Sequence, residues 1–157
     1  MKCWLPLGNS VSEVKYTEKE YGLEGNSKQE KDILDKTSKY YSVTERSKIY
    51  KPGAVYVLPS DKFRQVWRNH LLGESILLAD SDRFKYFTSL TLFPKGNLHF
   101  IKTSKEYIDL LANNDRKFLP LTYEAFFAAC IKHCPDENYK KWLDYLTRRY
   151  IVTNDVK

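Results

Sequence analysis

The sequence has 157 residues, of which 42% are hydrophobic and 29% charged. This is an ordinary globular composition, and it excludes wholesale disorder. A chain of this length most simply forms one domain with a substantial core. It carries 26 Lys and Arg against 20 Asp and Glu, and this net charge of +6 favours a polyanionic partner. No apolar run approaches the roughly 20 residues that span a bilayer, so we expect no membrane partner.

The cysteine content and the N-terminal sequence favour a cytoplasmic protein. Residues 1–8 are too few and become polar too soon to form a signal peptide. Three cysteines leave one unpaired in any disulfide scheme, so we expect reduced thiols. Cys130 and Cys134 share one predicted helix, but the chain has no Cys-x-x-Cys pair. We therefore interpret Cys130 as a core residue rather than as a zinc ligand.

The first predicted strand contains a charged pair. Within Glu13-Val14-Lys15-Tyr16-Thr17-Glu18, the period of two places Glu13 and Lys15 on one face. A carboxylate beside an ammonium can hold a metal ion and a water molecule on a phosphate. The same triplet is common as a surface ion pair, and the spacing leaves both interpretations open.

Two helices are predicted in the first half of the chain. The capping box at residues 27–30 (Ser-Lys-Gln-Glu) predicts a helix to about Tyr41. Residues 42–52 are polar and basic, and residues 54–58 form either a short strand or an apolar lead-in to the next helix. Ser60 and Asp61 are predicted to cap the strongest helix, which Gly73 interrupts late. Its inward stripe consists of Phe63, Val66, Trp67, His70, Leu71 and Leu78.

The outward face of this second helix carries side chains suited to nucleic acid. Arg64 and Arg68 lie one turn apart, as do Gln65 and Asn69. Arginine and amide groups contact phosphates and base edges well, although a solvated outer face is the competing interpretation. His70 lies within the apolar stripe, so we expect a packed, hydrogen-bonded histidine rather than a ligand.

Lysines interleaved with tyrosines form a second candidate surface for nucleic acid. The residues are Tyr16, Tyr21, Tyr40, Tyr41 and Tyr50, with Lys15, Lys39, Lys48 and Lys51. Such residues can bind a nucleic-acid strand by stacking and by phosphate contact. Half-buried packing of the tyrosines is the simpler alternative.

The second half of the chain alternates between strands and helices. We expect a strand at 84–93, a turn at 94–97 and a partner strand at 98–101. Thr103 or Ser104 then caps a helix, residues 118–121 are extended, and Thr122 caps the next helix. The last helix starts near Asp136 and is predicted to turn four residues inward: Trp142, Tyr145, Leu146 and Tyr150.

Three stretches carry a resemblance to a known family. They are residues 13–18, the Tyr21-Gly22-Leu23-Glu24 that follows, and the run Arg64-Gln65-Val66-Trp67-Arg68-Asn69-His70-Leu71-Leu72. Together they resemble the PD-(D/E)XK nuclease superfamily, with an uncharacterised bacterial, restriction-endonuclease-like branch as the nearest likeness. Nearly the whole chain from Val11 onward is compatible with the later part of such proteins.

The resemblance implies a fold, a reaction and a set of site residues. The fold is α/β, a partial restriction-endonuclease-like mixed sheet flanked by helices, with a helix-rich C-terminal half. The reaction is Mg²⁺-dependent hydrolysis of DNA. Glu13 matches the acid of the motif as catalytic residue and metal ligand, and Lys15 matches its lysine. Glu18 is a further metal-binding acid, and Gln65 is the polar residue near the site.

One element of the family pattern is missing. The family has an Asp on a strand upstream of the acid–lysine pair, but none of the twelve residues before Glu13 is acidic. We therefore expect residues 1–157 to form a single domain that corresponds to the C-terminal portion of a longer nuclease-like core. The chain is then a truncated copy or a descendant without catalysis.

The sequence leaves two other functions open. One is a non-catalytic nucleic-acid-binding domain that uses Arg64, Arg68, Asn69, Lys48 and Lys51. The other is a structural or partner-binding protein. Missing strands would leave an unpaired sheet edge, so a second copy of the chain is a further candidate partner.

Overall fold

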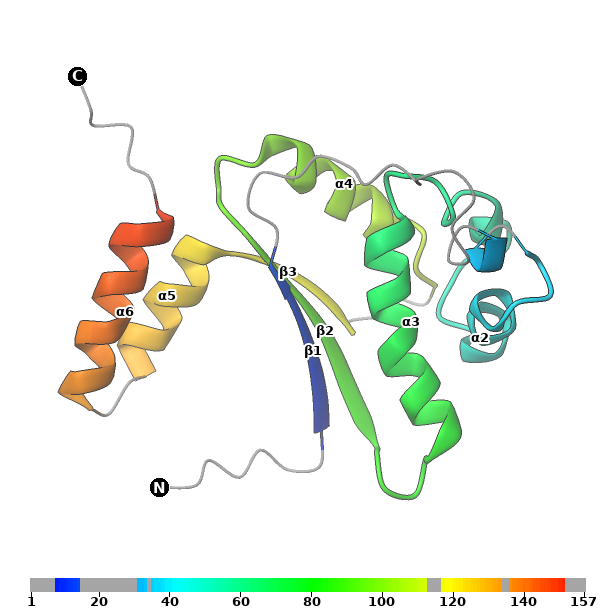
Figure 1. Cartoon of the computed structure of the whole chain (residues 1–157), viewed down its shortest axis with the longest axis horizontal. Coiled ribbons are helices and arrows are strands. Elements are labelled where there is room, and N and C mark those ends of the chain that lie inside the picture. The colour runs from blue at the N-terminus through cyan, green and yellow to red at the C-terminus, as the bar shows by residue number, and fades with distance from the viewer. Residues whose placement is uncertain (1–7, 15–30, 34, 113–116, 134–135, 152–157) are drawn as a thin grey trace.

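Three parallel strands form the sheet around which the chain folds (Figure 1). The computed structural model describes residues 8–14, 31–33, 35–112, 117–133 and 136–151, and for residues 8–14 it describes the backbone alone. The spatial order is β1-β2-β3. The strands are β1 (Gly8–Val14), β2 (Tyr86–Phe93) and β3 (Phe118–Thr122).

Helices cover both faces of this sheet, which confirms the predicted α/β class. In Figure 1, α2, α3 and α4 lie on one side of the strands, and the α5–α6 pair lies on the other. The helical elements are α2 (Lys39–Ser47), the 3₁₀ helix η1 (Ala54–Tyr56), α3 (Arg64–Ala79), α4 (Leu98–Asp109), α5 (Tyr123–His133) and α6 (Glu137–Tyr150). None of the described helices has the length and apolar content needed to cross a membrane.

The alternation of side chains along β2 divides the interior into two cores. Phe93 packs in the larger cluster, together with residues of α3 and α4. Leu92, its neighbour along the strand, packs in a smaller cluster with Phe127 of α5 and Leu143 of α6. Successive residues of a strand point to opposite faces, so this strand supplies both cores.

The larger core is built around Trp67 of α3, which is fully buried. The rings of Tyr40 and Tyr41 lie 5.7 Å and 5.9 Å from its ring. Its indole Nε1 donates a hydrogen bond of 2.9 Å to Thr44 Oγ1, which meets the need of a buried indole for an acceptor. These three contacts all come from α2, so Trp67 holds α2 against α3.

The position of α2 corrects the predicted helix from Ser27 to Tyr41. Residues 31–33 are helical, but residues 35–38 form a turn before α2 begins. In this turn the Asp35 carboxylate accepts hydrogen bonds from the backbone N–H and the hydroxyl of Thr37. The capping box at 27–30 lies outside the described residues. The helix then continues to Ser47, through residues that the sequence assigned to a polar linker.

Two segments predicted to be extended are helical. Ala54–Tyr56 forms a 3₁₀ turn, so the strand alternative for residues 54–58 is wrong. Leu98 starts α4 instead of a partner strand, because Asn97 Oδ1 accepts the Phe100 N–H at 2.9 Å and caps the helix. The predicted start at Thr103 or Ser104 is therefore one turn or more too late.

Other helix boundaries were predicted with mixed success. The cap of α5 is confirmed, since Thr122 Oγ1 accepts from the Ala125 N–H at 3.2 Å. The main helix begins at Arg64 rather than at Ser60, and it continues through Gly73 to Ala79. The predicted inward face of α6 is wrong at Trp142 and Tyr145, which are more than half exposed.

Candidate functional site

The predicted acid lies where the parallel strands end. Glu13 is the second-last residue of β1 and pairs in register with Thr91 of β2. Parallel strands bring their carboxyl ends to one edge of the sheet, and ligands of open α/β sheets bind beyond that edge. The backbone thus places Glu13 at the position where such a fold holds its chemistry. Lys15 and Glu18 lie outside the described residues.

The direction of α3 brings Gln65 toward the same edge. Gly73, late in α3, packs against the ring of Phe87, early in β2. Figure 1 shows that the helix runs antiparallel to the strands, so its first turn, with the half-buried Gln65, lies toward their carboxyl ends. The fold brings two of the three predicted catalytic residues, Glu13 and Gln65, to one end of the sheet.

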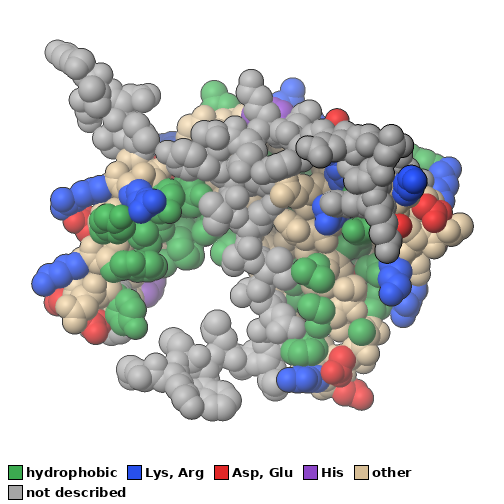
Figure 2. Space-filling model, viewed as in Figure 1, with side chains coloured by type: hydrophobic (Ala, Val, Ile, Leu, Met, Phe, Trp, Pro, Cys, Tyr) green, Lys and Arg blue, Asp and Glu red, His purple; other side chains and the backbone are tan. Residues whose placement is uncertain are grey.

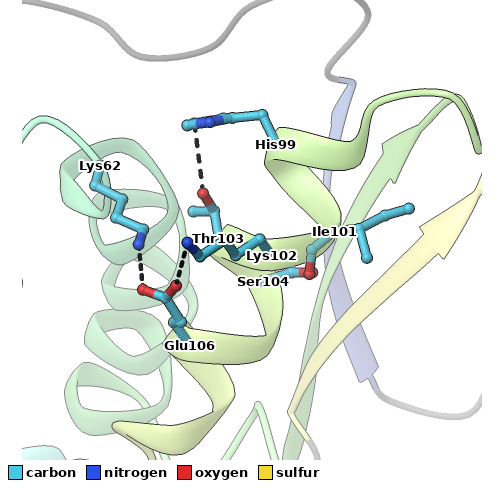
Figure 3. A network of polar contacts seen from close by, with 7 residues as sticks. All are labelled: Lys62, His99, Ile101, Lys102, Thr103, Ser104 and Glu106. Atoms are coloured by element: carbon cyan, nitrogen blue, oxygen red, sulfur yellow. Dashed lines mark hydrogen bonds and ion pairs between the residues drawn. The ribbon is translucent and has the colours of Figure 1, made fainter.

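Backbone and ion-pair contacts brace the helices at this end. The Lys95 N–H, in the turn after β2, donates to both carboxylate oxygens of Glu124 in α5, at 3.2 Å and 3.0 Å. In Figure 3, Lys62 and Lys102 both reach the Glu106 carboxylate, which joins α4 to the segment before α3. The hydrogen bond from Lys62 is the main cause that lowers the pKa of Glu106. Ion pairs near the surface contribute little free energy, so the main role of these contacts is orientation.

Arg64 is not on the exposed face on which the sequence placed it. It is buried, and its guanidinium Nη1 lies 2.5 Å from Asp61 Oδ1. It also donates to the Pro59 carbonyl at 3.5 Å. Arg64 therefore ties the start of α3 to the preceding turn, and a contact with nucleic acid would require it to leave these partners.

Arg68 and Asn69 line a groove between α2 and α3. The groove has a volume of about 290 Å³, and its wall also includes Lys39 and Tyr40 of α2. The Arg68 guanidinium lies 6.0 Å from the centre of the Tyr40 ring, a cation–π arrangement. Two cationic side chains beside an aromatic ring suit an anionic strand that also offers flat groups.

Lys39 and Tyr40 were predicted among the interleaved lysines and tyrosines, but not as neighbours of Arg68. The sequence analysis placed both on a helix that ended near Tyr41, so they had no expected relation to Arg68. The groove that Lys39 and Tyr40 share with Arg68 becomes visible only when the start of α2 and its packing on α3 are known. Trp67 fixes that start through its contacts across the core.

The predicted pair Lys48 and Lys51 is exposed beyond the end of α2. Lys48 is the C-cap residue of α2, in the left-handed conformation with φ of 55°. Lys51 Nζ donates to the Asp109 carbonyl at 2.7 Å, at the end of α4. The structure places neither lysine in the groove that Arg68 lines.

His70 is packed inside the larger core, as the sequence predicted. It is fully buried, and its Nδ1 lies 3.0 Å from the Tyr107 hydroxyl, which in turn lies 2.8 Å from that of Tyr50. Burial lowers its pKa to about 3, and the positive charge of Lys117 adds to this shift. Lys117 itself pairs with the buried Glu74 at 2.7 Å. His70 is thus a neutral core residue near pH 7.

The described residues contain no group of three or more His, Cys, Asp or Glu that could hold a metal ion. Cys130 packs against the smaller core, in agreement with its interpretation as a core cysteine, and Cys134 lies outside the description. The metal ligands expected from the family resemblance are Glu13, whose backbone alone is described, and Glu18.

The parallel sheet between two helical layers defines a protein of the α/β class. A family model described as the PD-(D/E)XK nuclease superfamily matches residues 11–152, which is most of the chain. The chain belongs to this superfamily. Comparisons with curated proteins and with solved structures found no match.

Proposed function

We propose that this chain binds DNA at the carboxyl edge of its sheet and hydrolyses a phosphodiester bond with the help of Mg²⁺, with Glu13 and Glu18 acting in place of an acid upstream of Glu13, where the sequence has none. The observation that carries the proposal is the position of Glu13 at the end of β1, inside the region that the family model matches. The net charge of +6 supports it, because it favours a polyanionic substrate.

The acids that the family resemblance assigns to the site suit Mg²⁺. Proteins hold Mg²⁺ through one or two carboxylates, with water and substrate phosphates as the remaining ligands. We assign these roles to Glu13 and Glu18, the two acids that the family resemblance names. When bound, Mg²⁺ polarises the phosphodiester and lowers the pKa of a water molecule.

The other residues position the substrate and balance its charge. Lys15 stabilises the negative charge that develops on the phosphate and orients the attacking water. Gln65, at the same end of α3, donates or accepts a hydrogen bond to that water or to the phosphate. Arg68 and Asn69 hold the DNA backbone farther along α3.

Plasmid cleavage in Mg²⁺ or Mn²⁺ tests this proposal. We expect Glu13→Ala and Lys15→Ala each to lower the rate by about a hundredfold or more, because each removes a group that acts on the developing charge. Asp82→Ala and Lys85→Ala are matched controls, since they remove an exposed acid and an exposed lysine just before β2, at the opposite edge. Cleavage that survives both site substitutions would refute the catalytic assignment.

A non-catalytic nucleic-acid-binding domain is the second candidate, and the groove between α2 and α3 favours it. This function needs Lys39 and Arg68 but not Glu13. It predicts salt-sensitive binding that Glu13→Ala leaves unchanged and that Lys39→Ala with Arg68→Ala weakens. Binding of this kind without cleavage in any metal would select the second candidate over the first.

A further inference from the structure

Helix α6 turns an aromatic face toward solvent. Tyr139, Trp142 and Tyr145 are 61%, 57% and 54% exposed, whereas Leu143 of the same helix is 5% exposed. Figure 2 shows hydrophobic side chains beside Lys and Arg over the α5–α6 pair. Single exposed rings are common, but three on one helix form a patch that suits a partner.

The start of this face is hollowed. Asp136, Asn138, Tyr139 and Trp142 line a hollow of about 470 Å³. The Asp136 carboxylate accepts the Asn138 N–H at 2.7 Å, which holds it at the start of the helix. Two aromatic rings with a carboxylate and an amide offer stacking surfaces together with donors and acceptors for a base edge. These are the groups with which proteins recognise unpaired nucleobases.

Basic side chains accompany the rings along α6. Glu137 pairs with Lys140 at 2.6 Å, and Asp144 pairs with Arg148 at 2.5 Å. These two ion pairs neutralise the charge of two of the four basic residues of α6. The other two are Lys141, which is exposed, and Arg149, which donates to the Tyr145 hydroxyl at 2.9 Å. A wholly apolar partner would desolvate these charges at a cost, whereas a phosphate backbone would be attracted to them.

We infer that α6 carries a binding site for an unpaired nucleobase in a single-stranded stretch of nucleic acid. Tyr139 and Trp142 stack on the base, Asn138 and Asp136 hydrogen-bond its edge, and Lys141 and Arg149 contact neighbouring phosphates. The inference rests on the proposed function for its polyanionic partner. It adds a preference for unpaired strands and a second contact surface, on the opposite face of the sheet from α3.

The test measures equilibrium binding by fluorescence anisotropy, with labelled single-stranded and duplex oligodeoxynucleotides and without divalent metal. We expect Trp142→Ala and Tyr139→Ala each to weaken single-strand binding by about tenfold, the effect of losing one stacked base, and duplex binding by much less. Trp142→Phe keeps a ring and should retain most of the affinity. Tyr86→Ala removes a similarly exposed ring at the start of β2 and is the matched control.

The phosphate contacts have a separate readout. Lys141→Ala and Arg149→Ala should each flatten the dependence of log affinity on log salt by about 0.7 for a single strand. Binding is measured without divalent metal and without cleavage, so a failed nuclease assay and a failed stacking site are distinguishable.

Three results would overturn the inference. The first is equal single-strand affinity in the wild type and in the two aromatic variants. The second is equal loss on single-stranded and duplex probes, which indicates no recognition of an unpaired base. The third is a change in sedimentation alone, in which Trp142→Ala dissociates a dimer without affecting nucleic-acid binding. That result would assign the face to a second copy of the chain.

Discussion

At the scale of single residues, Gly73 shows how close contact limits the choice of side chain. A Cβ at this position would lie 2.0 Å from Cε2 of Phe87, far inside van der Waals contact. Phe87 is itself buried, and its ring lies 5.4 Å from that of His70. The glycine therefore keeps α3 close to β2, although glycine is a poor helix former.

We predict that Gly73→Ala destabilises the protein by about 1–3 kcal/mol, because overpacking outweighs the gain in helix propensity. Urea unfolding measures the change. Phe87→Leu in the Gly73→Ala background should recover part of the loss, since it removes the ring that the new methyl group meets. A stabilised Gly73→Ala variant would show that α3 and β2 separate easily, contrary to this packing.

At the scale of elements, α6 depends on one deeply buried side chain. Leu143 packs with Leu92, Tyr123 and Phe127 in the smaller core, while its neighbour Trp142 is mostly exposed. The helix is also capped, because Asp136 Oδ1 accepts the Asn138 N–H. The attachment of α6 to the sheet thus depends on packing around Leu143 more than on the exposed rings of Trp142 and Tyr145.

Leu143→Ala should cost about 2–4 kcal/mol of unfolding free energy, through lost burial and a residual cavity. Trp142→Ala on the same helix is the matched control, and we expect it to change stability by less than about 1 kcal/mol. Denaturant unfolding of both variants, followed by circular dichroism, makes the comparison. A larger loss of stability in Trp142→Ala than in Leu143→Ala would show that Trp142 faces inward, as the sequence predicted.

The errors of the sequence analysis at this scale have physical reasons. The apolar residues Leu98, Phe100 and Ile101 fit a strand as well as a helix, and only the capping bond from Asn97 decides for the helix. Likewise, the true start of α2 depends on Trp67, a partner far along the chain. The Asn97 cap is a local signal that the expected turn at 94–97 obscured, whereas the Trp67 contact is tertiary and does not show in the local pattern.

Other features could be read from the sequence directly. The alternation of Ser89 to Leu92 predicted β2, and Thr122 predicted the start of α5. The strand predicted over residues 13–18 agrees with β1, Gly8–Val14, only at Glu13 and Val14. The shared groove of Lys39 and Arg68 could not be predicted, because it requires the packing of two helices.

At the scale of the whole molecule, the buried His70 makes the stability of the folded protein depend on pH. Its pKa is about 3 in the folded protein and 6.5 when unperturbed, with burial as the main cause and Lys117 as the second. Between these values the unfolded chain binds a proton that the folded chain does not. Its contribution to stability is therefore fully present above pH 6.5 and is lost as the pH falls toward 3.

We expect this one group to reduce the unfolding free energy by about 1.4 kcal/mol per pH unit within that window. His70→Gln, which keeps a hydrogen-bonding group near Tyr107, should show a flatter fall in stability from pH 6.5 to pH 4 than the wild type. His133→Gln removes an exposed imidazole and is the matched control. Parallel curves for the wild type and His70→Gln would refute the linkage.

The parallel pairing of β1 with β2 also has a consequence for the order of folding. Everything between Val14 and Tyr86, including α2 and α3, separates the two strands along the chain. Closing so long a loop is slow, whereas α2 and α3 are near neighbours in sequence and can associate early. The Trp67 core can therefore form before β1 docks. The strand that carries Glu13 would then be added late in folding, and the candidate site would be completed only when the rest of the sheet is in place.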